Sequence, residues 1–493
     1  MTHKHSKKKK HGELERSLKS RHMSMIAIGA SIGTGLFLTS GSAFSSAGPG
    51  GAVVAFIVMG LMVYFVSTSL AEMSSYLPVS GSFETFSSRF IDPAFGFAIG
   101  WNYWFSWAIT LAVEVSAATI IIQYWLPDTN VEIWAAVFLI FLFLMNYAPA
   151  KVFGESEFWF AGIKVVTVLV FLLIGVLMIF GIMGGEPSPG FSNWTLEDAN
   201  GNKGPFIGGF GAMLVAFMSA GFSFLGTEMV ALTAGEAEDP HTAVPKAIKT
   251  VFFRLMLFYL GTIIVIGFLI PFTHPNLLGA DTSDITISPF TMILERAGIA
   301  GAASLMNAII LTSVLSCGAS SLYGSSRMLY SMAQEGKAPK WLGKLDHRGV
   351  PINGVILTTV MASSVFLSSF VGTGRIYIAL YNISAITGFI IWFAIAWAHY
   401  RFRKAYLLQG GKLENLPYRA RMFPFGPIVA GVLNLVVIFG ANYSVLQAGN
   451  FNWFDFITSY GIIPLFIILY LWYKWKYKTK MVPLEQCDFT MHD

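Results

Sequence analysis

The chain has 493 residues, of which 55% are hydrophobic and only 12% are charged. Soluble globular proteins carry about 25% charged residues, so this composition excludes an ordinary soluble enzyme and a disordered chain. Two cysteines, Cys317 and Cys487, are too few for a fold held together by disulfides. An aromatic content of 15% and a mean hydropathy of +0.62 are typical of a protein that lies in hydrocarbon.

The first 22 residues, MTHKHSKKKKHGELERSLKSRH, are basic and form no apolar helix face. We expect residues 1–22 to be a cytoplasmic tail attracted to anionic lipid, rather than a segment that binds nucleic acid. The apolar run that follows is too long for a cleavable signal peptide, because it leads directly into a second span.

Stretches without Asp, Glu, Lys or Arg divide the rest of the chain into membrane spans. The first, residues 22–71, is long enough for two helices, which a Gly- and Pro-rich cluster at residues 45–51 separates. A helix needs about 20 apolar residues to cross a bilayer, so we expect twelve transmembrane helices in all. The other uncharged stretches are 93–113, 133–150, 165–185, 204–227, 255–280, 297–326, 349–374, 376–400, 422–454 and 456–473.

The basic residues indicate how these spans are oriented. By position, 28 of the 32 Lys and Arg residues fall in the two tails or in the loops after spans 2, 4, 6, 8 and 10. The loops on the opposite side hold only Lys203 and Arg375. Because basic loops stay in the cytoplasm, we expect a multi-pass protein of the cytoplasmic (inner or plasma) membrane with both termini cytoplasmic.

Two expected spans contain helix-breaking sequence in corresponding positions. Span 1 contains residues 29–35, GASIGTG, and span 6 contains residues 221–228, GFSFLGTE. Irregular backbone at membrane depth persists only where it is buried in protein or lines a cavity. Spans 1 and 6 are five apart, which predicts an inverted repeat whose broken helices meet at the midplane. The alternative is that the glycines merely allow close helix packing.

The repeat predicts the organisation of the chain. We expect a first repeat over 23–184 and a second over 206–400. Two further helices occupy 422–476, and a cytoplasmic tail occupies 477–493. The predicted fold class is therefore an all-α integral membrane protein with twelve transmembrane helices and a five-plus-five inverted repeat.

Broken helices also predict the chemistry of the ligand. The N-terminus of a half-helix presents free N–H groups and a positive dipole end, and its C-terminus presents free carbonyls. An α-amino acid matches both ends, although other small zwitterions would also fit. The sequence contains no His, Cys, Asp and Glu spacing typical of a metal site and no nucleophile–base motif. We therefore expect no metal, no cofactor and no enzyme activity.

Several motifs resemble the amino acid permeases of the amino acid–polyamine–organocation superfamily. They are SIGTGLF (31–37), GPGG (48–51), PVSGSF (78–83), GWNYW (100–104) and FSFLGTE (222–228). The resemblance covers essentially all of the chain after residue 14 and implies a leucine-transporter-like fold that imports an amino acid with protons.

Within that family the chain is most similar to the bacterial lysine permeases. That similarity rests on GEAEDP (235–240), HYRFR (399–403), LPYR (416–419) and FPFGP (423–427). These segments lie in predicted cytoplasmic loops or at span ends, away from the predicted substrate site.

The resemblance implies roles for individual residues around the two breaks. The substrate carboxylate would rest on the backbone of span 1, the α-ammonium would meet carbonyls of both breaks, and an aromatic lid would cover the substrate. The residues implied are Ser31, Gly33, Thr34 and Gly35 of span 1 and Phe222, Leu225 and Glu228 of span 6. Phe222 resembles the lid, and Lys164 resembles the span 5 lysine that stands in place of a sodium ion in proton-coupled relatives.

Ionisable residues inside a membrane span are expensive and usually functional. Glu228 follows the span 6 break directly, so we expect it to gain and lose a proton during transport; the alternative is an acid that only satisfies the freed backbone. Lys164 lies within three turns of Glu155 and Glu157. Its side chain has the length to reach the interface instead, which is the alternative for that residue.

Span 3 carries a polar and aromatic face. Tyr103, Trp107, Thr110 and Glu114 are spaced by 4, 3 and 4 residues, so they share one side of a helix. This face is either a packing stripe or a wall of the substrate site whose rings make cation–π contact with a lysine ammonium. We expect the second role for Tyr103, Trp107 and Glu114.

Together these features predict a proton-coupled importer of L-lysine whose partners are lysine, protons and the lipid bilayer. Two alternatives stay open: a permease for another amino acid, such as arginine or an aromatic one, and a membrane sensor that binds an amino acid without net transport. A regulatory membrane partner also stays open.

Overall fold

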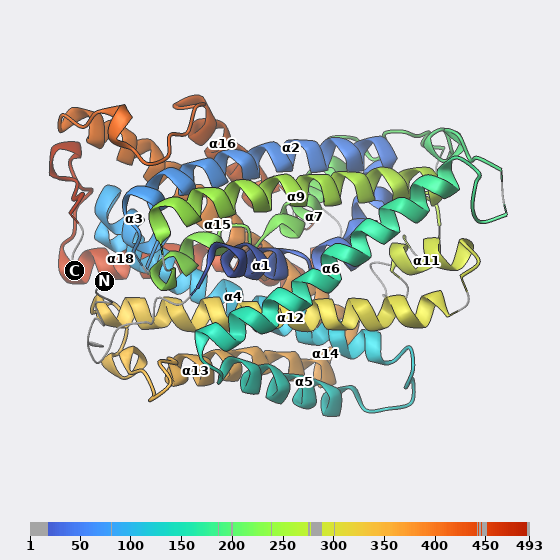
Figure 1. Cartoon of the computed structure of the whole chain (residues 1–493), viewed down its shortest axis with the longest axis horizontal. Coiled ribbons are helices and arrows are strands. Elements are labelled where there is room, and N and C mark those ends of the chain that lie inside the picture. The colour runs from blue at the N-terminus through green and yellow to red at the C-terminus, as the bar shows by residue number, and fades with distance from the viewer. Residues whose placement is uncertain are drawn as a thin grey trace, which may run out of the picture.

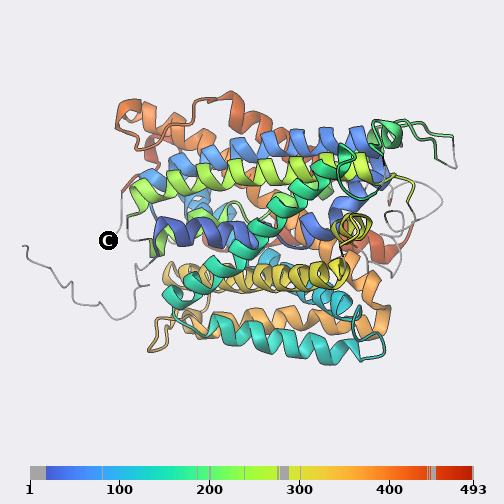
Figure 2. The same cartoon turned by 45° about the vertical axis from the view of Figure 1, so that its right-hand side comes forward.

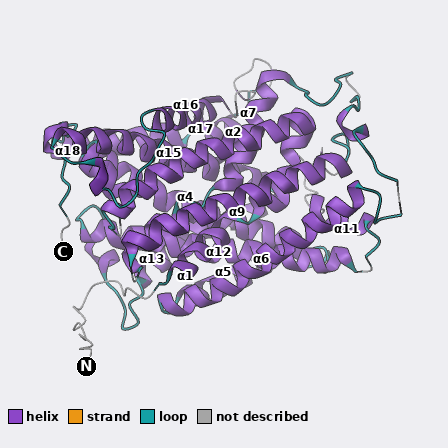
Figure 3. Cartoon of the chain, turned by 45° about the horizontal axis from the view of Figure 1, so that its top comes forward, coloured by secondary structure: helices purple, strands orange, loops and turns teal. Residues whose placement is uncertain are grey.

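The computed structural model describes residues 18–490 apart from 80, 186, 199–200, 238, 275–276, 278–287, 300, 441, 443–444 and 446–450. The described residues form helices and loops, and their only bridges are two isolated pairs, Leu18 with Ala237 and Glu197 with Lys203 (Figure 3). Most helices run side by side along the long axis, and α6 crosses α1 and α12 obliquely (Figures 1 and 2).

The helices follow one another along the whole described chain. The α-helices are α1 (Ser20–Ser31), α2 (Ser40–Tyr76), α3 (Phe83–Phe90), α4 (Pro93–Ile122), α5 (Val131–Asn146), α6 (Ala150–Ile179), α7 (Gly209–Phe224), α8 (Met229–Leu232), α9 (Pro240–Leu269), α11 (Pro289–Arg296), α12 (Ala302–Gln334), α13 (Ile352–Ala362), α14 (Ser368–Val371), α15 (Thr373–Leu408), α16 (Phe425–Gly440), α17 (Trp453–Tyr460) and α18 (Ile462–Tyr477). A π-helix, η1 (Gly35–Thr39), precedes α2, and the 3-10 turns are η2 (Ser192–Trp194), η3 (Thr233–Glu236), η5 (Lys340–Gly343), η6 (Ser363–Leu367), η7 (Leu413–Asn415) and η9 (Leu484–Gln486).

Eight of the helical segments in the described residues are long and apolar enough to cross a membrane, or nine if the bent pair α17 and α18 forms one span. Two further apolar helices, α5 and α16, have 16 residues each, which is shorter than the 18 residues required here of a membrane span. The all-helical membrane character is thereby confirmed, whereas the count of twelve spans stays a prediction.

Local sequence explains where several helices begin. Asp92 caps α4 by accepting a hydrogen bond from the Ala94 N–H at 2.9 Å, and Asn130 and Asn452 cap α5 and α17 in the same way. Proline occupies the first turn of α4, α9 and α11, where its missing N–H needs no partner.

The break predicted at residues 45–51 is confined to one residue. Gly48 has φ 75° and ψ 173°, which is not helical, and the helical segments of α2 on either side of it meet there. A side chain would be strained at this φ, and a Cβ would lie 2.6 Å from the Pro205 carbonyl oxygen. The loop before α7 therefore packs directly on the turn.

The centre of the bundle is built around α4, which is almost wholly buried and packs mainly against α12 and α15. By contrast, only about a third of the most apolar part of α6, and of the segment Ile352–Val371 that begins with α13, is buried, as expected of helices that face lipid. The polar residues of α4 therefore point into protein and not into hydrocarbon.

Buried ion pairs tie the helices together at the end of the bundle where α3, α18 and the C-terminus lie (Figure 1). The Glu72 carboxylate of α2 accepts from the Arg403 guanidinium of α15 and from the Ala420 N–H at 2.7 Å. Nearby, Lys337 donates to Glu84 at 2.5 Å and to Glu335 at 2.6 Å. Burial opposes the charge of Lys337, but the two carboxylates outweigh it and raise the pKa of the ammonium above its usual range.

The sequence predicts two tails, two repeats and a final pair of helices. Of the basic tail predicted over 1–22, residues 1–17 lie outside the described part of the chain. The two repeats over 23–184 and 206–400, the pair of helices over 422–476 and the tail over 477–493 stay predictions.

Replacing Arg403 by Met should destabilise the protein by about 3–5 kcal/mol, because it leaves the Glu72 carboxylate buried without its cation. The measurement is thermal unfolding of the purified protein in detergent. The matched control is Lys404→Met, which removes an exposed charge from the same helix and should change stability by about 0.5 kcal/mol or less. Equal melting temperatures for the two variants would show that the buried pair contributes nothing.

Candidate functional site

The helical backbone is interrupted at two places that lie against each other. After α1 ends at Ser31, residues Ile32 and Gly33 are not helical. After α7 ends at Phe224, Gly226 has φ 102°, and α8 begins only at Met229. A Cβ on Gly226 would lie 2.8 Å from the carbonyl carbon of Ala30. The α7 interruption thus lies against the last turn of α1, directly before the α1 interruption begins.

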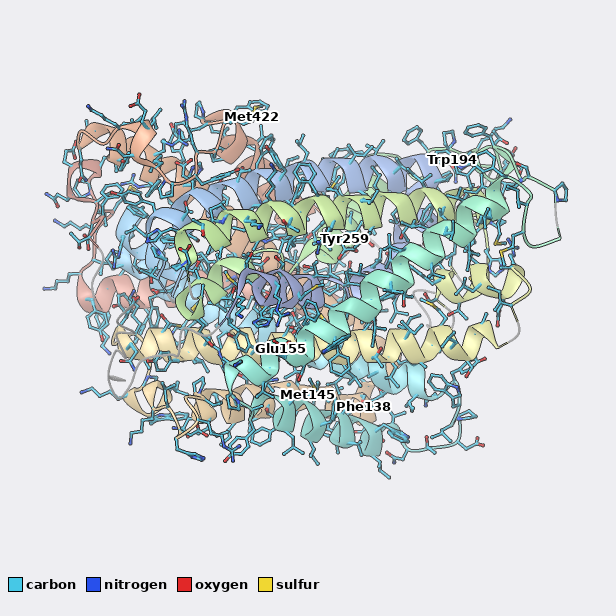
Figure 4. The ribbon with its side chains drawn as sticks, viewed as in Figure 1. Phe138, Met145, Glu155, Trp194, Tyr259 and Met422 are labelled. Atoms are coloured by element: carbon cyan, nitrogen blue, oxygen red, sulfur yellow. The ribbon has the colours of Figure 1, made fainter. Side chains whose placement is uncertain are left out.

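The last three carbonyls of α1 each accept a hydrogen bond from a side chain of a different helix. The donors and acceptors are Lys164 Nζ of α6 to Gly29 O (2.6 Å), Cys317 Sγ of α12 to Ala30 O (2.9 Å) and Tyr259 OH of α9 to Ser31 O (2.8 Å). The end of an α-helix leaves such carbonyls without intrahelical partners and carries a partial negative charge. Lys164 thus places a cation where the helix dipole favours one; Tyr259 is labelled in Figure 4.

On the other side of the α1 interruption, a carboxylate holds the first free amide. Glu114 of α4 accepts from the Thr34 hydroxyl at 3.0 Å and from the Thr34 N–H at 3.4 Å. A Cβ on Gly33 would lie 2.7 Å from the same carboxylate. The amide contact is longer than the 2.9–3.0 Å typical of an N–H···O bond, so the Thr34 N–H is only weakly satisfied.

The α7 interruption has its own acid. Glu228 is buried, and its Oε2 accepts from the Gly226 N–H at 3.1 Å and from the indole Nε1 of Trp392 at 3.1 Å. The carboxylate therefore folds back on the interruption that precedes it and links it to α15.

Aromatic and small residues pack around both interruptions. The Phe222 ring meets Tyr381 edge to face, with ring centroids 4.6 Å apart. A Cβ on Gly35 would lie 2.7 Å from Ser223 Cα, and a Cβ on Gly388 would lie 2.5 Å from the Leu225 side chain. Gly35 thus permits η1 to approach α7 closely, and Gly388 permits α15 to approach the α7 interruption.

The predicted face of α4 is buried, but its members contact different neighbours. Tyr103 packs on Phe83 with ring centroids 4.6 Å apart and on Trp107 at 6.1 Å. The Tyr103 hydroxyl has no hydrogen-bond partner within the described structure. Thr110 bonds to Ser384 at 2.6 Å, and only Glu114 reaches α1.

The structure therefore brings several predicted residues together. Gly33, Thr34 and Glu114 lie together at the α1 interruption. Leu225 and Glu228 lie at the α7 interruption. Lys164 does not extend to the interface, because its side chain is fully buried and its ammonium is held by Gly29. The Tyr103 ring contacts the rings of Phe83 and Trp107, so these ring contacts in the described residues lie within and beside α4.

Sequence reasoning missed Cys317, Tyr259 and Trp392, which donate hydrogen bonds to these interruptions. Each lies in an apolar stretch whose periodicity gives no reason to single it out. It also missed Glu157, which is fully buried in α6. For Glu157 a signal existed, since an acid two turns before a buried lysine shares its helix face.

Among the residues that the structure describes, no group of three or more His, Cys, Asp or Glu side chains is placed to hold a metal ion. What the site offers instead is backbone amides and carbonyls that have left the helical hydrogen-bond pattern, the carboxyl groups of Glu114 and Glu228 and the ammonium of Lys164, all buried within protein. Such a set suits a small zwitterionic solute.

A model of the amino acid permease family matches residues 22–485 of this chain. The chain belongs to the amino acid permease family. It is 48% identical to the lysine-specific permease of Escherichia coli over 97% of both chains. The lysine-specific permease of Lactococcus lactis is 47% identical over 97% of this chain and 94% of its own length. A histidine permease of the same organism is 46% identical over 97% and 98%.

Membership confirms the family inferred from the sequence motifs and identifies a multi-pass membrane permease for amino acids. The family consists of transporters and not of enzymes, in accord with the expectation from the sequence. The roles predicted for individual residues stay predictions, because the comparisons concern the chain as a whole.

Gly226→Ala should abolish transport, because a Cβ would both strain the positive φ and push the α7 interruption away from Ala30. The strain alone is expected to lower stability by about 1–3 kcal/mol. The measurement is amino acid uptake by membrane vesicles, with the amount of folded protein determined in parallel.

The control is Gly410→Ala, which carries a similar strain at φ 84° with no atom within 4 Å of the added Cβ. It should keep transport and lose only stability. Full uptake by Gly226→Ala would show that transport does not require the close approach of Gly226 to Ala30.

Proposed function

We propose that the chain imports L-lysine together with protons, by alternating access around a site between the α1 and α7 interruptions. The observation that carries the proposal is that the α7 interruption lies against the last turn of α1, with Glu114 buried beside the α1 interruption and Glu228 buried beside the α7 interruption. The lysine-specific names of two relatives that match nearly the whole chain favour lysine as the substrate.

The proposal includes the architecture predicted from the sequence. Twelve spans form two inverted repeats of five and a final pair, and the interrupted helices are spans 1 and 6. Both termini face the cytoplasm, because most Lys and Arg residues lie on that side. The ion pairs Arg403–Glu72 and Lys474–Asp92 support this orientation, because their basic residues belong to the set assigned to the cytoplasmic side. Figure 1 shows α3 and α18, which these pairs adjoin, at the same end of the bundle.

In this proposal the substrate carboxylate binds the backbone of residues 33–35. The Thr34 N–H already donates to a carboxylate, that of Glu114, but only at 3.4 Å. A substrate carboxylate at normal hydrogen-bond distance would replace this weak contact. Carbonyls of Ser31, Phe222 and Leu225 would then receive the α-ammonium, since a carbonyl that already accepts one hydrogen bond has a second lone pair.

The lysine side chain would extend between the aromatic and acidic groups of the site. Phe222 closes over the substrate, and Tyr103 and Trp107 present ring faces suited to an ammonium. Glu228 supplies the carboxylate that gains and loses the coupled proton, and Lys164 holds the place of a coupling cation at the end of α1.

A histidine permease is almost as similar to the chain as the lysine permeases, so histidine is the main competing substrate. Both amino acids carry a cationic side chain when protonated. Strict lysine specificity is thus the part of the proposal that most needs a direct test. Binding without net uptake would instead indicate a sensor.

Purified protein in proteoliposomes should take up labelled lysine, and unlabelled lysine should compete better than histidine, arginine or phenylalanine. An interior-negative potassium diffusion potential should accelerate uptake, because each charge that enters gains about 2.3 kcal/mol per 100 mV. Exchange of sodium for choline at constant pH should change nothing, since Lys164 occupies the place of the coupling cation.

A sodium requirement would contradict the role of Lys164. Stronger competition by histidine than by lysine would overturn the substrate. A rate of lysine uptake that does not change with the membrane potential would contradict entry of a net cation.

Glu228→Gln should abolish proton-driven accumulation of lysine but retain exchange of internal for external lysine. Glutamine keeps the hydrogen bonds to Gly226 and Trp392 but cannot titrate. The measurement compares accumulation with counterflow in the same proteoliposomes. The control is Glu414→Gln, an exposed acid, which should behave as the wild type. Accumulation with unchanged pH dependence would reduce Glu228 to a structural role and make Glu114 the next acid to test.

A further inference from the structure

Glu157 is a buried acid that the proposed function leaves without a role. Its side chain is fully buried in α6, where the Ser316 hydroxyl of α12 donates to its Oε1. Its Oε2 has no hydrogen-bond partner in the described part of the chain. Burying a charged carboxylate with one unsatisfied oxygen costs folding free energy, and protonation lowers that cost because it removes the charge.

Glu157 and Lys164 both approach the same residue, Gly29 of α1. The two residues are seven apart on α6, so they lie on one face of the helix, two turns from each other. Both contact Gly29 of α1: Lys164 Nζ donates to its carbonyl at 2.6 Å, and a Cβ there would lie 1.9 Å from Glu157 Oε1. Only glycine at position 29 lets the carboxyl approach the end of α1 in this way.

The position of Glu157 also connects it to the exposed start of α6. Glu155, two residues earlier, is 39% exposed and pairs with Arg21 at 2.6 Å and with His22 at 2.9 Å (Figure 4). His22 in turn packs where Gly154 lacks a side chain. Along α6, Glu157 therefore lies between the exposed Glu155, two residues before it, and Lys164, two turns after it.

The other titratable groups near this part of α1 come from α1 itself and from the helices packed against it. They are Lys164 on α6, His22 on α1, Cys317 on α12, Tyr259 on α9 and Glu114 on α4. Cys317 and Tyr259 are engaged with carbonyls of α1, and Glu114 is engaged with Thr34. By contrast, Glu157 keeps one carboxyl oxygen without a hydrogen-bond partner in the described residues and lies along α6 between Lys164 and the exposed Glu155.

We propose that Glu157 is a second proton-binding site, which receives the proton released by Lys164 and delivers it to the side of the membrane on which residue 155 is exposed. This inference rests on the proposed proton symport and deepens it. The Lys164 ammonium transfers one proton to the Glu157 carboxylate, leaving a neutral amine and a carboxylic acid with no change in total charge. The acid then releases the proton to water, and the amine takes up the next proton from the opposite side.

The test uses the full chain in proteoliposomes with a pH-sensitive dye in the lumen. Net lysine uptake should acidify the lumen of wild-type vesicles. In Glu157→Gln both net accumulation and acidification should fall about a hundredfold, the lower end of what a positioned proton-transfer group contributes. Lysine counterflow, which needs no net proton movement, should persist, because glutamine still accepts the Ser316 hydrogen bond.

Two further variants separate proton transfer from structure. Glu157→Asp keeps a titratable group and should restore part of the acidification. Glu155→Gln removes a neighbouring exposed acid and should leave lysine-driven acidification at the wild-type level.

The possible outcomes are distinguishable. Acidification at the wild-type rate in Glu157→Gln would overturn the proton site while leaving symport intact. Equal losses in Glu157→Asp and Glu157→Gln, with counterflow lost as well, would assign Glu157 a structural role and also overturn it. Wild-type protein that transports lysine without acidifying the lumen would contradict the proposed symport itself.

Discussion

The rest of the structure depends on how this chain satisfies backbone that has left the helix within apolar spans. Hydrocarbon supplies no hydrogen bonds, so every freed carbonyl and amide must find a partner in protein. The final turn of α1 achieves this with three donors from three helices, Lys164, Tyr259 and Cys317. These contacts bind α6, α9 and α12 to one short stretch, and they determine where those helices lie.

The α7 interruption is satisfied in a more local way. Its positive-φ glycine, Gly226, lets the backbone reach Ala30, and Glu228 folds back to accept the glycine's own N–H. Only Trp392 reaches this acid from another helix. The α1 interruption is thus held by surrounding helices, while the α7 interruption is held largely by its own segment and its contact with α1. A rearrangement of α7 would break fewer interhelical hydrogen bonds than one of α1.

The buried charged side chains fall into two groups: those in ion pairs and those hydrogen-bonded to neutral partners. At the end that carries the basic loops, acids such as Glu72 and Glu84 are paired with Arg403 and Lys337, which favours a fixed arrangement of helix ends. Around the interruptions no ion pair is recorded within the described residues; the acids accept from hydroxyl, indole or amide groups, and Lys164 donates to a carbonyl. Groups held by neutral partners can change protonation with less disruption than ion-paired groups. This contrast is the physical basis for seeking proton coupling in the interior.

The sequence by itself determined the membrane character and the family, because these follow from composition, from uncharged stretches and from the sequence motifs. Its glycine-rich motifs near residues 33 and 226 also predicted where broken helices would lie. It also singled out Lys164 and Glu228, since a charge inside an apolar stretch is visible in one dimension. Only the tertiary structure decided which groups satisfy the freed backbone. Tyr259 and Trp392 look like ordinary apolar residues of their spans until α9 and α15 place their polar atoms against a carbonyl and a carboxylate. Hydrogen bonds between helices depend on rotation and crossing of the helices, which no periodicity along one helix encodes.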